Sequence, residues 1–175
     1  MSLFLFCILI YGNLVFAQSE QEMIDQIRKE YMEITDGVVN EVFDVQVKSF
    51  GKAEDSYDLE IYSKNDKVMH LVQSYNDGSH AAGTTSFYLL NNGLTFIYKD
   101  FGYWMFSGQD EDGNSTTIDH VVETRCYYKN GKAFRCLGKS FNSKDHPKGS
   151  GSVKNLAIEC TECADLFEVL KALKY

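Results

Sequence analysis

The sequence has few basic residues, and this shortage excludes two classes of partner. Lysine and arginine together number 17, against 25 aspartate and glutamate residues, so the formal net charge is −8 at pH 7. Nucleic acids and anionic membranes are both recognised by clustered lysine and arginine side chains. The composition therefore predicts no nucleic-acid partner, whereas a basic protein is compatible with the acidic surface.

The sequence also lacks an apolar run long enough to cross a bilayer as a helix. The longest run, residues 3–16, falls short of the roughly 20 apolar residues that a spanning helix needs. It ends at the small residue Ala17, which is the pattern of a secretory signal peptide, although no lysine or arginine precedes it. We therefore predict a signal peptide over residues 1–17, a single domain over 18–175, and a secreted or periplasmic protein without a membrane span after cleavage. A buried N-terminal helix or strand is the alternative.

No constellation of residues that would fix a reaction is present. Hydrolytic chemistry needs a nucleophile, a base and an orienting group that converge. Asp119 and His120 are adjacent, but neighbours on a strand face opposite ways, so Glu123 cannot join both. The acidic turn 110–114 has calcium-type oxygens without the spacing of an EF-hand loop. We predict no catalytic residue, no metal site and no cofactor; the remaining histidines are isolated: His70, His80 and His146.

Four cysteines remain outside the predicted signal peptide: Cys126, Cys136, Cys160 and Cys163. An even number in an exported chain favours disulfides. With a two-residue turn at Asn130-Gly131, Cys126 and Cys136 face opposite sides of the sheet, and with a three-residue loop they are diagonal. Neither register places them directly opposite each other, as a disulfide requires. We therefore favour disulfides from this hairpin to the 160–163 segment, with local bridges within each pair as the alternative.

The segment Cys160-Thr161-Glu162-Cys163 has the local order of a thioredoxin-like site, because a strand precedes it and a helix follows. A helix N-terminus lowers the pKa of a thiol. However, only twelve residues follow Cys163, and the sole proline, Pro147, precedes the motif. A structural disulfide is therefore the prediction, with a four-thiolate zinc site as a further alternative.

The spacing of apolar residues changes along the chain from a helical period to a period of two. Residues 19–22 form a capping box, and apolar residues at helical spacing predict a helix that ends near Thr35, before Gly37. Alternation predicts strands at 42–49, 57–63, 68–74, 84–90, 94–100, 103–107, 116–129 and 132–141. A second helix is predicted over 161–173. The fold is therefore α+β: an N-terminal helix, an antiparallel β-meander of about 7–8 strands and a C-terminal helix, with the helices on one face of the sheet.

Two Asn-Gly turns support the meander. Asn92-Gly93 and Asn130-Gly131 each follow a pair of aromatic residues in a strand-like run. Asn-Gly between apolar runs predicts a hairpin, because both turn positions need positive φ. The segments 123–137, 87–96 and 27–34 resemble motifs of secreted Bacteroidetes proteins that have no assigned activity. This resemblance implies the compartment and the fold; Cys126 and Cys136 stand where that group usually has aromatic or apolar residues.

The aromatic residues Tyr103, Trp104 and Phe106 are the candidate binding surface. Either both faces of their strand are covered, or one face is exposed for a ligand or partner. We predict an exported, non-catalytic binding module for a protein, peptide or glycan, one form being an acidic inhibitor of a basic secreted enzyme such as a lysozyme. The alternative is a secreted enzyme, a hydrolase or a thiol-disulfide oxidoreductase, which a cleft joining His120, Glu123 and another titratable group would favour.

Overall fold

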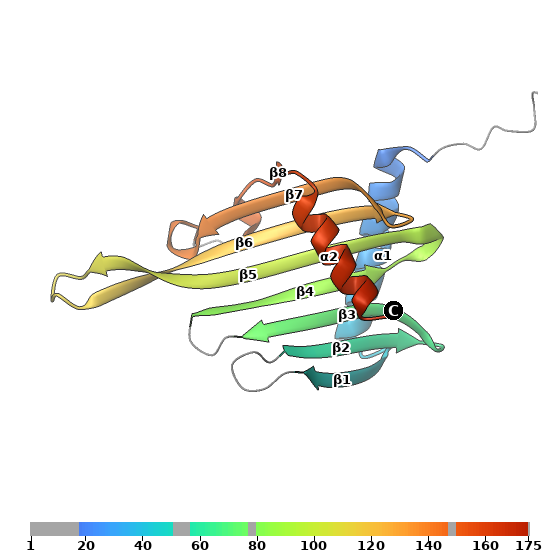
Figure 1. The fold of residues 1–175 in the computed structure, drawn as a ribbon, viewed down its shortest axis with the longest axis horizontal. Helices are drawn as coiled ribbons and strands as arrows, with labels where there is room; N and C mark the ends of the chain where they lie inside the picture. Colours follow the sequence, from blue (N-terminus) through green and yellow to red (C-terminus); the bar gives the residue numbers. More distant parts are fainter. Residues whose placement is uncertain (1–17, 51–56, 77–79, 147–149, 175) are drawn as a thin grey trace, which may run out of the picture.

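The computed structural model describes residues 18–50, 57–76, 80–146 and 150–174. It shows one eight-stranded antiparallel sheet with a helix on each face (Figure 1). The predicted signal peptide, residues 1–17, lies outside the described residues.

The strands follow one another across the sheet in sequence order, so the predicted meander is confirmed. They are β1 (Asp44–Phe50), β2 (Tyr57–Lys64), β3 (Lys67–Asn76), β4 (Ala81–Leu89), β5 (Leu94–Gln109), β6 (Ser115–Lys129), β7 (Lys132–Asn142) and β8 (Leu156–Ala157). The separate strands expected at 94–100 and 103–107 are one continuous strand. Gly102 does not interrupt it, because this residue pairs with Ala82 on one side and Val121 on the other.

The two Asn-Gly turns differ in geometry but lie together. Asn130 and Gly131 have φ values of 49° and 76° and form the two-residue turn between β6 and β7. The first hairpin instead closes through a short 3₁₀ turn, Asn91–Gly93. The backbone N–H of Asn130 donates to the carbonyl of Gly93 at 2.8 Å, so the ends of the two hairpins support each other.

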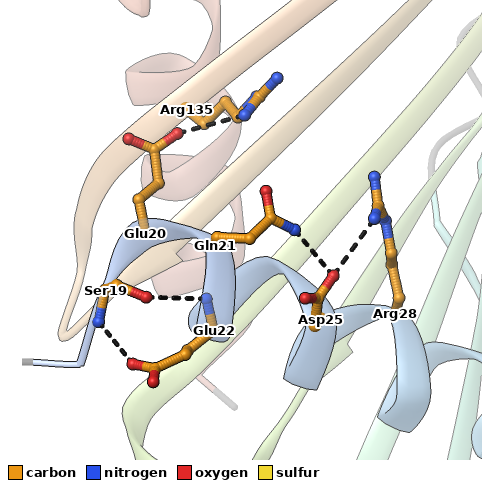
Figure 2. A network of polar contacts seen from close by, with 7 residues as sticks. All are labelled: Ser19, Glu20, Gln21, Glu22, Asp25, Arg28 and Arg135. Carbon is orange, nitrogen blue, oxygen red and sulfur yellow. Dashed lines mark hydrogen bonds and ion pairs between the residues drawn. The ribbon is translucent and has the colours of Figure 1, made fainter.

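The helix α1 spans Glu20–Val39 and begins as predicted with a capping box. The Ser19 hydroxyl accepts a hydrogen bond from the backbone of Glu22, whose carboxylate accepts one from the backbone of Ser19 (Figure 2). The predicted end near Thr35 is wrong, because Gly37 lies inside the helix. A Cβ at Gly37 would come within 2.6 Å of the Phe43 ring. The glycine therefore permits close packing rather than ending the helix.

The helix α2 spans Thr161–Ala172, close to its predicted bounds, but the helices do not share a face of the sheet. Figure 1 shows α1 and α2 on opposite sides. Each face of the sheet can hold a helix because adjacent strand residues, whose side chains point to opposite faces, are both apolar. Phe87 contributes to the α2 side, and its neighbour Tyr88 to the α1 side.

Two hydrophobic cores result, one under each helix. The α2 core contains Leu59, Ile61, Leu71, Phe87, Ile97, Cys126, Tyr128, Cys136, Cys163, Leu166 and Leu170. The α1 core contains Ile24, Ile27, Ile34, Tyr88, Leu90, Leu94, Phe96 and Tyr127.

Two disulfides fasten the start of α2 to the sheet, in the favoured pairing. Cys126 bonds to Cys163 and Cys136 to Cys160, with Cα–Cα distances of 5.6 and 5.5 Å. The register argument that led to this pairing is wrong, because Cys126 and Cys136 lie directly opposite each other. A bulge beside Tyr127 shifts the register by one residue and places both cysteines on the α2 face.

Removing the second disulfide tests its contribution to stability. The double variant C136A/C160A loses a link across 24 residues of sequence. Without this link the unfolded chain gains conformational entropy. The free energy of unfolding, measured by urea denaturation, is therefore expected to decrease by about 3 kcal/mol. Non-reducing peptide mapping of the variant should retain the Cys126–Cys163 link. An unchanged unfolding midpoint, or a wild-type link between Cys126 and Cys136, would contradict this connectivity.

The α1 core contains a buried histidine without a hydrogen-bond partner. The ring of His70 lies between those of Tyr62 and Tyr88, with centroid distances of 5.2 and 4.2 Å. Neither imidazole nitrogen has a hydrogen-bond partner within the described ranges. Burial lowers the pKa of His70 from 6.5 to about 4, so the folded protein holds it neutral at pH 7.

This histidine predicts a stability loss in acid. Between pH 6.5 and 4 the unfolded chain binds a proton at His70 that the folded chain excludes. Stability is therefore complete above pH 6.5 and decreases as the pH falls, by about 3 kcal/mol at pH 4. H70F keeps an aromatic ring without a charge and should flatten this part of the stability–pH curve. H80Q, a substitution at an exposed histidine, is the control, and a similar flattening in both variants would refute the assignment.

Candidate functional site

The strands β5 and β6 extend beyond their neighbours in the sheet as a two-stranded arm. The pairing of β4 with β5 ends at Tyr103, and that of β7 with β6 ends at His120. Figure 1 shows the hairpin projecting beyond the other strands. We define the β5–β6 arm as residues 105–118. Among the described strands, β5 and β6 pair only with each other over this range.

The arm carries exposed apolar side chains on both of its faces. Phe106 is 71% exposed and Met105 is 40% exposed. Adjacent residues of a strand point to opposite faces, so the two side chains lie on different sides of the arm. An arm with this pattern presents apolar contact area in two directions.

The structure brings together two of the three predicted surface residues. The ring of Trp104 stacks on His80 at 4.5 Å and meets Phe106 edge-to-face at 5.3 Å. Tyr103 lies on the other face of β5, where its ring approaches that of His120 at 5.1 Å. The predicted surface is therefore a Trp104–Phe106 pair at the base of the arm, and Tyr103 faces away from it.

The tip of the arm is acidic and held in one shape. The Asp110 carboxylate accepts hydrogen bonds from the backbone of Asp112 at 3.0 Å, from the backbone of Asn114 at 2.8 Å and from the amide of Asn114 at 3.1 Å. The bonds from Asn114 hold the pKa of Asp110 below its usual value. Glu111 and Asp112 are exposed beside it. The tip presents negative charge in a fixed turn.

The acid–base candidates do not converge. His120 lies on the α2 face of β6, where its Nδ1 is 2.9 Å from the Asn142 side-chain oxygen. Glu123 lies on the opposite face, 2.8 Å from Arg125 and 3.3 Å from Lys139. His120 and Glu123 are three residues apart on β6, and side chains alternate along a strand, so the two point to opposite faces of the sheet.

A second carboxylate, which the sequence did not single out, pairs directly with Glu123 across the ladder. This is Asp100, and burial together with the negative charge of Glu123 raises its pKa. Burial acts in the same direction on Glu123. Hydrogen bonds from Ser150 and Tyr98 and the charges of Arg125 and Lys139 outweigh it and lower the pKa of Glu123. To detect this cluster from the sequence, one would have to know the register in which β5 pairs with β6, because that register places Asp100 opposite Glu123.

This cluster ties β6 to β7 through a buried carboxylate. Glu123 is 2% exposed, and its two cationic partners compensate the buried charge. The guanidinium of Arg125 also donates to Asn155 at 2.6 Å, which ties the segment before β8 to the sheet. The arrangement is that of a satisfied buried ion network.

The cysteine motif does not form a dithiol pair, because Cys160 and Cys163 bond to different strands. Within the ranges that the structure describes, no three His, Cys, Asp or Glu side chains are placed to hold a metal ion. The same ranges contain no helix long and apolar enough to span a membrane.

No family model matches the chain, and no match was found among curated proteins or among solved structures.

Proposed function

We propose that this chain is an exported, non-catalytic module that binds a basic protein with its β5–β6 arm. The observation that carries the proposal is the arm itself, which leaves the sheet while keeping apolar side chains exposed on both faces. An isolated two-stranded hairpin is marginally stable in water. On one face of the arm, Phe106 and Trp104 form an aromatic pair of the kind that interface cores favour.

The distribution of the apolar residues favours a cleft over a flat surface on the partner. Met105 and Phe106 point to opposite sides of the arm, so a flat partner could cover only one of them. A partner that receives the arm in a cleft buries both. Trp104 then lies at the entrance, beside His80.

Charge favours a basic partner. The tip carries the three consecutive acidic residues Asp110, Glu111 and Asp112, and the whole chain has a net charge of −8. Opposite charge on the partner accelerates association and selects against acidic proteins. A basic secreted hydrolase with an open substrate cleft, such as a lysozyme, has the required chemistry, and this chain would act as its inhibitor.

Export completes the proposal. It rests on the signal-peptide pattern of residues 1–17 and on the resemblance to secreted Bacteroidetes proteins, and it agrees with the two disulfides. The protein would work in the periplasm or outside the cell. A hydrolase is the second candidate, but its most plausible acid, Glu123, is closed off from solvent.

A binding assay tests the arm. Residues 18–175 are titrated against a panel of basic secreted hydrolases that includes a lysozyme, and affinity is measured by biolayer interferometry at two salt concentrations. F106A removes the most exposed aromatic side chain of the arm and is expected to weaken binding at least ~10-fold, as at an interface hot spot. The association rate should also decrease as salt increases.

The matched control is F50A, the same substitution at a partly exposed phenylalanine of the edge strand β1. It should leave the affinity unchanged. Absence of binding to every basic hydrolase, or equal losses in F106A and F50A, would refute the proposal.

A further inference from the structure

The three arginines of the chain gather around one pocket, although the acidic residues are spread widely. The chain has only Arg28, Arg125 and Arg135. Arg28 and Arg125 line a cavity of about 330 Å³ between α1 and the sheet. Arg135 lies directly opposite Tyr127, another residue of the cavity wall, in the β6–β7 register.

The pocket has an aromatic floor with one arginine built into it. The floor is a square of four residues on two strands, in which Phe96 pairs with Tyr127 and Tyr98 pairs with Arg125. The helix α1 closes the other side with the side chains of Ile27, Arg28 and Tyr31. A volume of this size is at the small end of ligand pockets and suits a compound with a single ring.

Arg125 is fixed in position before any ligand arrives. Its guanidinium donates to Glu123 at 2.8 Å and to Asn155 at 2.6 Å, and it lies over the ring of Tyr98 at 5.0 Å. These contacts hold the planar group rigidly at the edge of the pocket. A fixed guanidinium recognises a carboxylate with little loss of conformational freedom.

The other two arginines are available for exchange. Figure 2 shows Arg28 paired with Asp25 and Arg135 paired with Glu20, at 3.2 and 3.3 Å. The Arg28 side chain is 66% exposed, and ion pairs of this kind contribute little to stability. Arg28, which lines the pocket, can therefore turn from its surface partner to a ligand at small cost.

We propose that this pocket binds a small aromatic carboxylate. The ring would pack among Tyr31, Phe96 and Tyr127, and the carboxylate would meet Arg28 and Arg125, because arginine matches planar carboxylates with paired hydrogen bonds. The ligand is either a free aromatic acid or the C-terminal aromatic residue of a peptide. The site lies on α1 and the central strands, away from the arm, so it stands independently of the proposed function.

Calorimetric titration of residues 18–175 with 3-phenylpropionate tests the proposal. The expected result is saturable binding of one equivalent with a dissociation constant below about 1 mM. The neutral analogue 3-phenylpropionamide has the same ring and should bind at least ~10-fold more weakly. R28Q should weaken the acid at least ~5-fold and leave the amide unaffected.

The control is K29Q, which removes the same charge from the next residue of α1, outside the pocket lining. K29Q should bind the acid as the wild type does, and both variants should keep the wild-type melting temperature. Acetyl-glycyl-phenylalanine distinguishes the sources, since binding of both acids indicates a peptide C-terminus and binding of 3-phenylpropionate alone indicates a free acid. No saturation by 5 mM, equal binding of acid and amide, or equal effects of R28Q and K29Q would overturn the proposal.

Discussion

The pairing of β5 with β6 is the constraint on which the rest of the molecule depends. These two long strands form the middle of the sheet, and their residues are apolar on both faces over the inner half of the pairing. Ile97 and Cys126 point to the face of the sheet that supports α2. Phe96 and Tyr127 point to the opposite face, which supports α1. Because side chains alternate along a strand, a shift of one residue would exchange the two cores and their cysteines.

The proposed pocket, the Glu123 ion cluster and the proposed binding arm lie along the same pair of strands. At the end of this pair that carries the two Asn-Gly turns, aromatic residues of both strands and Arg125 form the floor of the pocket under α1. Farther along, between the apolar cores and the outer half of the sheet, the buried carboxylate of Glu123 is compensated by the charges of Arg125 and Lys139. Beyond Tyr103 the neighbouring strands end, and the pair continues alone as the arm. The two proposed binding surfaces therefore share one support, the β5–β6 pair.

Local patterns predicted the elements, and their arrangement in space needed the structure. The capping box at Ser19, the Asn-Gly turn at Asn130 and the order of the strands were readable from the sequence. The sequence did not indicate which face of the sheet each helix covers, because strands that are apolar on both faces are compatible with helices on one face or on both. The bulge beside Tyr127 was equally hidden, and it reversed the register argument for the cysteines. The arginine pocket joins α1, β5 and β6, so no local pattern indicates it.

Amide hydrogen–deuterium exchange along β5 and β6 tests the central claim most directly. If the inner part of the pair is the frame and the arm is supported by it alone, amides of residues 94–102 exchange only through global unfolding. Those of residues 105–118 then exchange through local opening, at least ~1,000-fold faster. Equal protection along the whole of β5, or slower exchange in the edge strand β1 than in residues 94–102, would contradict the account.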